Sequence, residues 1–275
     1  MNGLTNWLGQ RLSSYLSQRL KSHEPTVAMD LARYAACLRA ADVLLVEGDT
    51  RLSVAIKYLT QSTWSHAALY VGPEAGLRND AGEPLVFIEA DVAAGVRARE
   101  MDAYRGLHCR ICRPVGLTGV ERRQVVDYAI SRLGHRYDLK NVIDLARYLL
   151  PTPPVPVGWR RRMLHLGSGD PTRAICSTLI AQCFDAVKYP ILPQVETVAD
   201  ANPSDGAPRR VHHLRHHSLY VPRDFDVSPY FQIVKPTLTL GFDFHRLVWA
   251  TDESMPEDAA DAAYRQAGTP QEGVS

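Results

Sequence analysis

The sequence, 275 residues long, lacks the features that assign a protein to several large classes. It has no apolar run that approaches the roughly 20 residues needed to cross a bilayer. Its N-terminal region has neither a continuous apolar core nor a small-residue cleavage site, so no secretory signal is predicted. With 31 Lys and Arg against 30 Asp and Glu, the net charge is +1, which gives no bulk electrostatic basis for binding nucleic acid.

Cysteine is also scarce. The chain has five, an odd number scattered along its length, which argues against a disulfide framework and for a reducing compartment. A cytoplasmic location is therefore predicted. The composition, 45% hydrophobic and 22% charged, is ordinary for a globular protein with one sizeable core.

Two groups of metal-binding residue types do not predict a metal site. Cys109 and Cys112 have the spacing of a zinc knuckle, but no second Cys or His pair follows at a suitable distance, and the segment has the pattern of a strand. His212-His213 and His216-His217 could bind zinc if their segment is helical, yet no carboxylate or cysteine completes the set. A basic, solvated surface helix or loop is the favoured interpretation there, and no metal or other cofactor is predicted.

One cysteine lies in a pattern that indicates chemistry. Apolar side chains follow Cys176 at a helical spacing, at Leu179, Ile180, Cys183 and Val187. Asp170-Pro171-Thr172 supplies cap and breaker residues upstream, which predicts that Cys176 lies in the first turns of a helix. The positive end of the helix dipole and the free backbone N–H groups favour the nucleophilic thiolate there. The alternative is a small core residue of an apolar helix.

Two upstream segments carry polar residues within apolar runs. His66 opens a run that ends at Gly72-Pro73, the pattern of a buried strand followed by a turn. Glu89 lies in the middle of a second apolar strand, over residues 85–91, where packing alone would prefer an apolar side chain. A carboxylate that orients an imidazole, which in turn deprotonates a thiol, is the generalised catalytic triad. The alternative for His66 is a hydrogen-bonded histidine of the core.

Five short motifs follow one another along the chain: Gly48-Asp49, Ser65-His66, Ile88-Glu89-Ala90, Tyr137-Asp138 and Cys176-Ser177. This ordered set resembles the YiiX/YaeF-like permuted papain-fold hydrolases of the NlpC type. In that family a circular permutation places the histidine before the cysteine, and this chain has the same order. The segment from Tyr220 to Ser228 resembles the family's Pro-Asp-containing strand that leads to a Ser. The resemblance covers residues 40–236.

The resemblance implies an α+β fold with a small antiparallel sheet or barrel packed against helices, and thiol chemistry on an amide or ester. It implies that Cys176 is the nucleophile, His66 the base and Glu89 the residue that orients the imidazole. Tyr137 matches a position near the active site and would donate a hydrogen bond to an oxyanion, with a half-buried packing role as its alternative. The backbone N–H of Cys176 would be the second donor.

These residues predict a thiol hydrolase or acyltransferase that forms an acyl-enzyme on Cys176. The expected substrate is a small peptide, an amino-acid amide or a lipid-like acyl compound. Two rival interpretations stay open. One is an acyltransferase or phospholipase of the lecithin:retinol acyltransferase type, which shares the histidine-first order and acts on lipids. The other is a catalytically inactive binding module in which Cys176 is a core residue.

Three regions are predicted: an N-terminal helical extension (1–39), the catalytic domain (40–236) and a partly disordered C-terminal extension (237–275). The apolar stripe and basic charges of residues 4–20 suit a helix on an anionic membrane surface, although packing on the domain or on a partner chain is favoured. Residues 151–171 form a long loop with three consecutive arginines, Arg160 to Arg162, either a lid over the nucleophile or a solvated basic loop. Other expected elements are helices through residues 29–38, 54–59, 120–133 and 139–150, and strands over residues 43–46, 95–99 and 109–114.

Overall fold

The computed structural model describes residue 18 and residues 30–91, 94–135, 175–198 and 209–247. The chain divides into two compact units, Met1–Leu240 and Gly241–Ser275. In the second unit the described residues, 241–247, contain one short 3-10 helix, η4 (Phe244–Arg246). All elements discussed below belong to the first unit.

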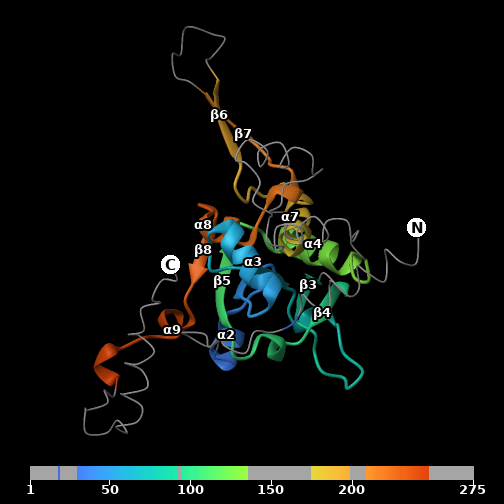
Figure 1. The fold of residues 1–275 in the computed structure, drawn as a ribbon, viewed down its shortest axis with the longest axis vertical. Coiled ribbons are helices and arrows are strands. Elements are labelled where there is room, and N and C mark those ends of the chain that lie inside the picture. Colours follow the sequence, from blue (N-terminus) through green and yellow to red (C-terminus); the bar gives the residue numbers. More distant parts are fainter. Residues whose placement is uncertain (1–17, 19–29, 92–93, 136–174, 199–208, 248–275) are drawn as a thin grey trace, which may run out of the picture. The chain divides into compact units, whose positions relative to one another are not determined.

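The first unit mixes helices with antiparallel strands (Figure 1). Its described helices are α2 (Leu31–Cys37), α3 (Arg51–Thr60), α4 (Gly119–Ser131), α7 (Ile175–Asp185), α8 (Pro222–Val227) and α9 (Pro236–Thr239). Its strands are β1 (Val43–Glu47), β2 (His66–Tyr70), β3 (Phe87–Asp91), β4 (Gly95–Arg99), β5 (His108–Pro114), β6 (Gln194–Val198), β7 (Arg209–His213) and β8 (Phe231–Val234). Short 3-10 helices are η1 (Pro73–Ala75), η2 (Met101–Tyr104) and η3 (His217–Leu219).

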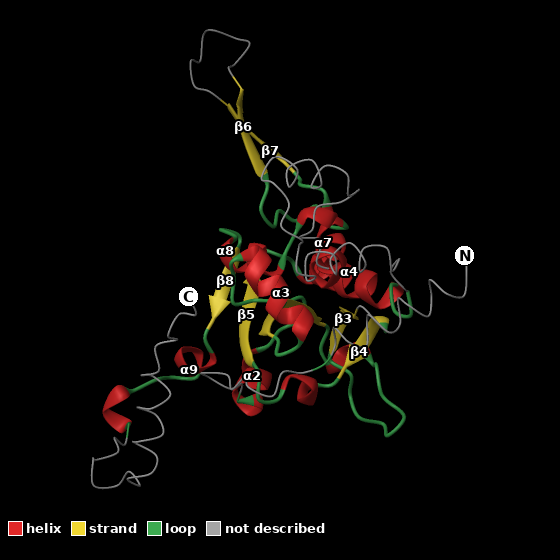
Figure 2. Cartoon of the chain, in the orientation of Figure 1, coloured by secondary structure: helices red, strands yellow, loops and turns green. Residues whose placement is uncertain are grey.

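Six strands form the central sheet in the order β4-β3-β2-β1-β5-β8, with every neighbouring pair antiparallel. Figure 2 shows these strands among the helices, with β6 and β7 as a separate two-stranded sheet. The predicted α+β class with an antiparallel sheet is therefore confirmed.

Both faces of the sheet are buried, which explains why its central strands are apolar without alternation. On β1, Val43 and Leu45 pack into one core cluster, whereas Leu44 and Val46 pack into another. The first cluster includes buried side chains of α4, α7 and α8, and the second includes those of α2 and η2. Because side chains alternate along a strand, β1 contributes residues to two separate cores.

Local capping explains where the helices next to the site begin. Thr118 and Glu121 form a capping box at the start of α4, and the Thr50 side chain accepts the Ser53 N–H at the start of α3. A Cβ at Gly48, just before α3, would lie 2.2 Å from the Ser53 hydroxyl, which would have to move. The predicted Gly48-Asp49 turn is thus a point of close packing.

Most predicted elements within the described residues are present with shifted ends. The main correction concerns residues 220–228, because the predicted strand is instead helix α8, which starts at Pro222. Proline fits the first helical position, and the Asp224 carboxylate accepts the Val221 N–H there. The histidine-rich segment is also not a surface helix or loop throughout, since Arg209–His213 pairs with Gln194–Val198 as β7.

Several predicted features lie outside the described residues. These are the N-terminal helix over residues 4–20 apart from residue 18, the helix over 139–150, the Arg160–Arg162 loop, Tyr137 and the tail after residue 247. Those assignments stay predictions.

Candidate active site

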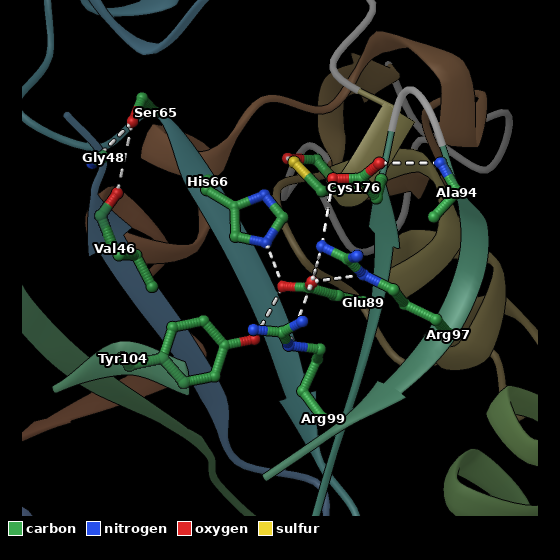
Figure 3. A network of polar contacts seen from close by, with 12 residues as sticks. Val46, Gly48, Ser65, His66, Glu89, Ala94, Arg97, Arg99, Tyr104 and Cys176 are labelled. Carbon is green, nitrogen blue, oxygen red and sulfur yellow. Dashed lines mark hydrogen bonds and ion pairs between the residues drawn. The ribbon is translucent and has the colours of Figure 1, made fainter. Parts of the chain in front are cut away.

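The three residues predicted to form a triad come from three separate elements. His66 is the first residue of β2, Glu89 is the central residue of β3, and Cys176 is the second residue of α7. Cys176 and Glu89 are buried, at 5% exposure each, and the His66 side chain is 25% exposed. The structure brings all three together (Figure 3).

The sheet opens where these residues meet. Strands β2 and β3 pair at Leu69 with Ile88 and at Tyr70 with Phe87, but the pairing does not continue toward His66. Ala67 would be the next residue of β2 to bond β3, because backbone N–H groups on one edge of a strand recur every second residue. Its N–H instead lies close enough to the sulfur of Cys176 to lower the pKa of that thiol. The start of α7 therefore occupies the place where the β2–β3 ladder ends.

The imidazole of His66 bridges the carboxylate and the thiol. Its Nε2 atom lies 2.7 Å from Oε2 of Glu89. The sulfur of Cys176 lies close enough to the same ring for the two groups to shift each other's pKa. Figure 3 shows the sulfur and the carboxylate on opposite sides of the imidazole, so the second ring nitrogen faces Cys176. This arrangement fixes the ring orientation and directs one nitrogen at the thiol.

Glu89 is held by more groups than the sequence revealed. Its Oε2 atom also accepts the hydroxyl of Tyr104 at 2.7 Å, and its Oε1 atom accepts Nε of Arg97 at 3.0 Å. Arg99 lies further away, with Nε 3.8 Å from Oε1. Arg97 stands directly opposite Glu89 in the β3–β4 register, whereas Tyr104 follows on η2. The alternating pattern of Arg97 and Arg99 on β4 was the available sequence signal for two of these residues.

The charges of the site favour a thiolate and an imidazolium. Burial alone would disfavour the imidazolium, but the Cys176 thiolate and the Glu89 carboxylate raise the pKa of His66 well above its ordinary value. Burial likewise opposes ionisation of the thiol, yet the His66 charge, its hydrogen bond and the Ala67 N–H lower the pKa of Cys176. Glu89 is buried too, but His66, Tyr104 and Arg97 depress the pKa of its carboxyl group.

The other cysteines differ in this respect. Burial raises the pKa of Cys109 and of Cys183 to about 12, and it raises the pKa of Cys112 as well. Cys183 is only two turns further along the same helix, and no ion pair with an imidazole compensates its burial. Among these four thiols, only Cys176 is stabilised in its charged form.

The Ser65-His66 and Gly48-Asp49 motifs meet in the structure. The backbone N–H of Gly48 donates to the buried hydroxyl of Ser65 at 2.9 Å. The residue after Ser65 is His66, the first residue of β2, which pairs with Val46 of β1. The contact therefore ties the turn after β1 to the first residue of β2 and supports the position of the imidazole.

Two further findings concern the described residues alone. No group of three or more His, Cys, Asp or Glu side chains among them is arranged to hold a metal ion. None of their helices combines the length and apolarity needed to cross a membrane. Tyr137, the fourth predicted site residue, lies outside this part of the chain.

Comparisons with known proteins give little further information. No family model matches the chain, and no curated protein matches it either. Among solved structures, the chain is similar to the crystal structure of the metalloprotein YiiX from Escherichia coli O157:H7, with 15% sequence identity and a TM-score of 0.41. The similarity covers 72% of this chain and 96% of that chain.

Proposed function

We propose that this protein is a thiol hydrolase or acyltransferase with a permuted papain-like fold, which forms an acyl-enzyme on Cys176. The observation that carries the proposal is the ordered contact from Glu89 through His66 to Cys176 at the start of α7. A buried cysteine with only a packing role has no need for an imidazole that is itself oriented by a carboxylate.

The proposed reaction begins with attack of the Cys176 thiolate on the carbonyl carbon of an amide or ester. The imidazolium of His66 then donates its proton to the leaving amine or alcohol as the C–N or C–O bond breaks. The neutral imidazole next removes a proton from water or from an acceptor nucleophile, which attacks the thioester and releases the thiolate. Glu89 keeps the ring oriented and stabilises its protonated form throughout.

The pKa directions support this assignment of roles. The lowered pKa of Cys176 favours the nucleophilic thiolate, and the raised pKa of His66 favours the protonated imidazole that the leaving group requires. The Tyr104 hydroxyl and the Arg97 guanidinium keep the Glu89 carboxylate ionised and fixed. Glu89 therefore orients the imidazole and does not act as a general acid.

The test is to trap the acyl-enzyme. The purified protein is mixed with p-nitrophenyl acetate, release of p-nitrophenol is followed, and the intact mass is measured after an acid quench. The expected result is a burst of one equivalent and a mass increase of one acetyl group on the peptide that contains Cys176. Cys176→Ala should show neither, whereas Cys183→Ala, altered on the same helix, should keep both.

An added amine separates hydrolysis from acyl transfer. If an amine accelerates turnover of the acetylated protein and is itself acetylated, transfer is favoured; if only water reacts, hydrolysis is favoured. A protein that shows no burst and no acetylated Cys176 with any activated ester or thioester contradicts the proposal and favours a binding module.

A further inference from the structure

A second arginine, Arg99, lies beside the proposed catalytic carboxylate, Glu89, but forms no hydrogen bond with it. In the β3–β4 register Glu89 pairs with Arg97, and Phe87 pairs with Arg99. Side chains two residues apart on a strand point to the same face, so both arginines lie on the face that carries Glu89. Figure 3 shows both guanidinium groups beside the Glu89 carboxylate.

The two arginines differ in how well they are paired. Arg97 donates Nε to Oε1 of Glu89 at 3.0 Å and Nη2 to Oδ2 of Asp91 at 3.1 Å, so it links two carboxylates. Arg99 is 3.8 Å from Oε1 of Glu89, which is beyond hydrogen-bond range. Its buried Nε has no hydrogen-bond partner in the part of the chain that the structure describes.

Glu89 has little capacity left to accept a hydrogen bond from Arg99. Its Oε2 atom accepts hydrogen bonds from His66 and Tyr104, and its Oε1 atom accepts one from Arg97. A closer approach of Arg99 would compete with a group that orients the imidazole. A buried N–H without a partner is costly, so its presence in a native site calls for an explanation.

The exposure of the Arg99 side chain suggests which kind of group could be its hydrogen-bond partner. The side chain is 32% exposed, and among its guanidinium nitrogens only Nε is a buried atom without a partner. A guanidinium presents a planar fork of donors that matches the two oxygens of a carboxylate or phosphate. An anion that bonds to the Nη groups of Arg99 would pair with its charge without displacing Arg97.

We propose that Arg99 is a specificity-determining residue, which binds a carboxylate or phosphate group of the substrate that is acylated onto Cys176. The inference rests on the proposed function and adds a substrate class, an acyl compound that carries an anionic group. The competing explanation is that Arg99 only balances the charge of Glu89.

A pair of alkylating reagents tests this without knowledge of the natural substrate. Iodoacetate and iodoacetamide attack the same thiolate and differ chiefly in the negative charge of iodoacetate. The rate of Cys176 labelling is measured with each by peptide mass spectrometry, and the ratio of the two rates is compared between wild type and Arg99→Gln. A changed ionisation of Cys176 affects both reagents alike, so the ratio isolates attraction of an anion.

We expect Arg99→Gln to lower the iodoacetate-to-iodoacetamide ratio about three- to tenfold at low salt, the effect of losing one nearby positive charge near a protein surface. Arg99→Lys should retain most of the ratio, and added salt should reduce the ratio in wild type toward that of Arg99→Gln. The matched control is Arg105→Gln, because Arg105 is a nearby arginine, 69% exposed and paired with Asp102. It should leave the ratio unchanged.

The outcomes separate the two proposals. A ratio that is equal in wild type and Arg99→Gln, with Cys176 still reacting rapidly, overturns the role of Arg99 and leaves the proposed function intact. A Cys176 that reacts no faster than Cys183 with either reagent overturns both. Inorganic phosphate and acetate are then compared as protecting ions, and the ion that slows labelling of wild type but not of Arg99→Gln identifies the group.

Discussion

The ion pair between Cys176 and His66 predicts a large effect of one substitution. His66→Ala removes the positive charge and the hydrogen bond that lower the pKa of Cys176, and it leaves burial, which opposes ionisation. A thiol with the ordinary pKa of 9.0 is about 1% ionised at pH 7. In wild type, by contrast, the depressed pKa favours the thiolate.

The change in ionised fraction sets the magnitude. It alone would slow alkylation of Cys176 by up to about 100-fold at pH 7. A thiolate of higher pKa is intrinsically more nucleophilic, which offsets part of the loss, so a decrease of about tenfold or more is expected. The rate in His66→Ala should also rise about tenfold per pH unit between pH 6 and 8, because the ionised fraction of a high-pKa thiol does so.

The assay is the rate of iodoacetamide labelling of each cysteine in the folded protein, read by peptide mass spectrometry at several pH values. The matched control is His108→Ala, since His108 also pairs with a carboxylate, at 3.1 Å from Glu47, and is not among the groups that shift Cys176. The reasoning is refuted if His66→Ala labels as fast as wild type with the same pH profile, or if Cys176 and Cys183 react equally in wild type.

Three further predictions follow from the same contacts. Glu89→Gln should lower the free energy of unfolding by about 2–3 kcal/mol at pH 7, because it removes a buried charge that Arg97 and His66 face. Because the pKa of Glu89 is lower in the folded protein, its contribution to stability is present above the ordinary value of 4.5 and is lost as the pH falls through the folded pKa. Denaturant midpoints of wild type and Glu89→Gln that differ equally at pH 7 and pH 3 would contradict this. Tyr104→Phe keeps the buried ring but removes one donor to Glu89, so it should cost about 1–2 kcal/mol in urea unfolding, whereas Tyr58→Phe, at a position 75% exposed, should cost nothing measurable. Deleting residues 1–22 should leave the core folded with a lower melting temperature, and neither the full chain nor the truncation should bind vesicles. Flotation of the full chain with anionic liposomes, abolished by the truncation, would show instead that this segment binds membranes.

Local patterns in the sequence determined much of the central sheet and its helices. The apolar runs of β1 and β2 predict strands that the structure contains, because such runs depend on residues a few positions apart. The sequence also marked Glu89 as a carboxylate that needs a partner, since burial of an unpaired charge is costly. It placed Cys176 at the start of a helix for the same local reason.

Tertiary structure alone decided how these residues combine. The end of the β2–β3 ladder and the contact of Ala67 with the thiolate depend on where α7 packs, more than 100 residues along the chain. Tyr104 is a partner of Glu89 only because η2 folds back beneath β3, and no periodicity in the sequence reveals that. Arg97 bonds to Glu89 and Arg99 does not because their distances from its carboxylate differ by about an ångström. That difference depends on packing across strands and not on residue type. Sequence patterns report which face a side chain occupies, whereas the hydrogen bonds that give a site its charge state require contacts between elements that only the folded chain brings together.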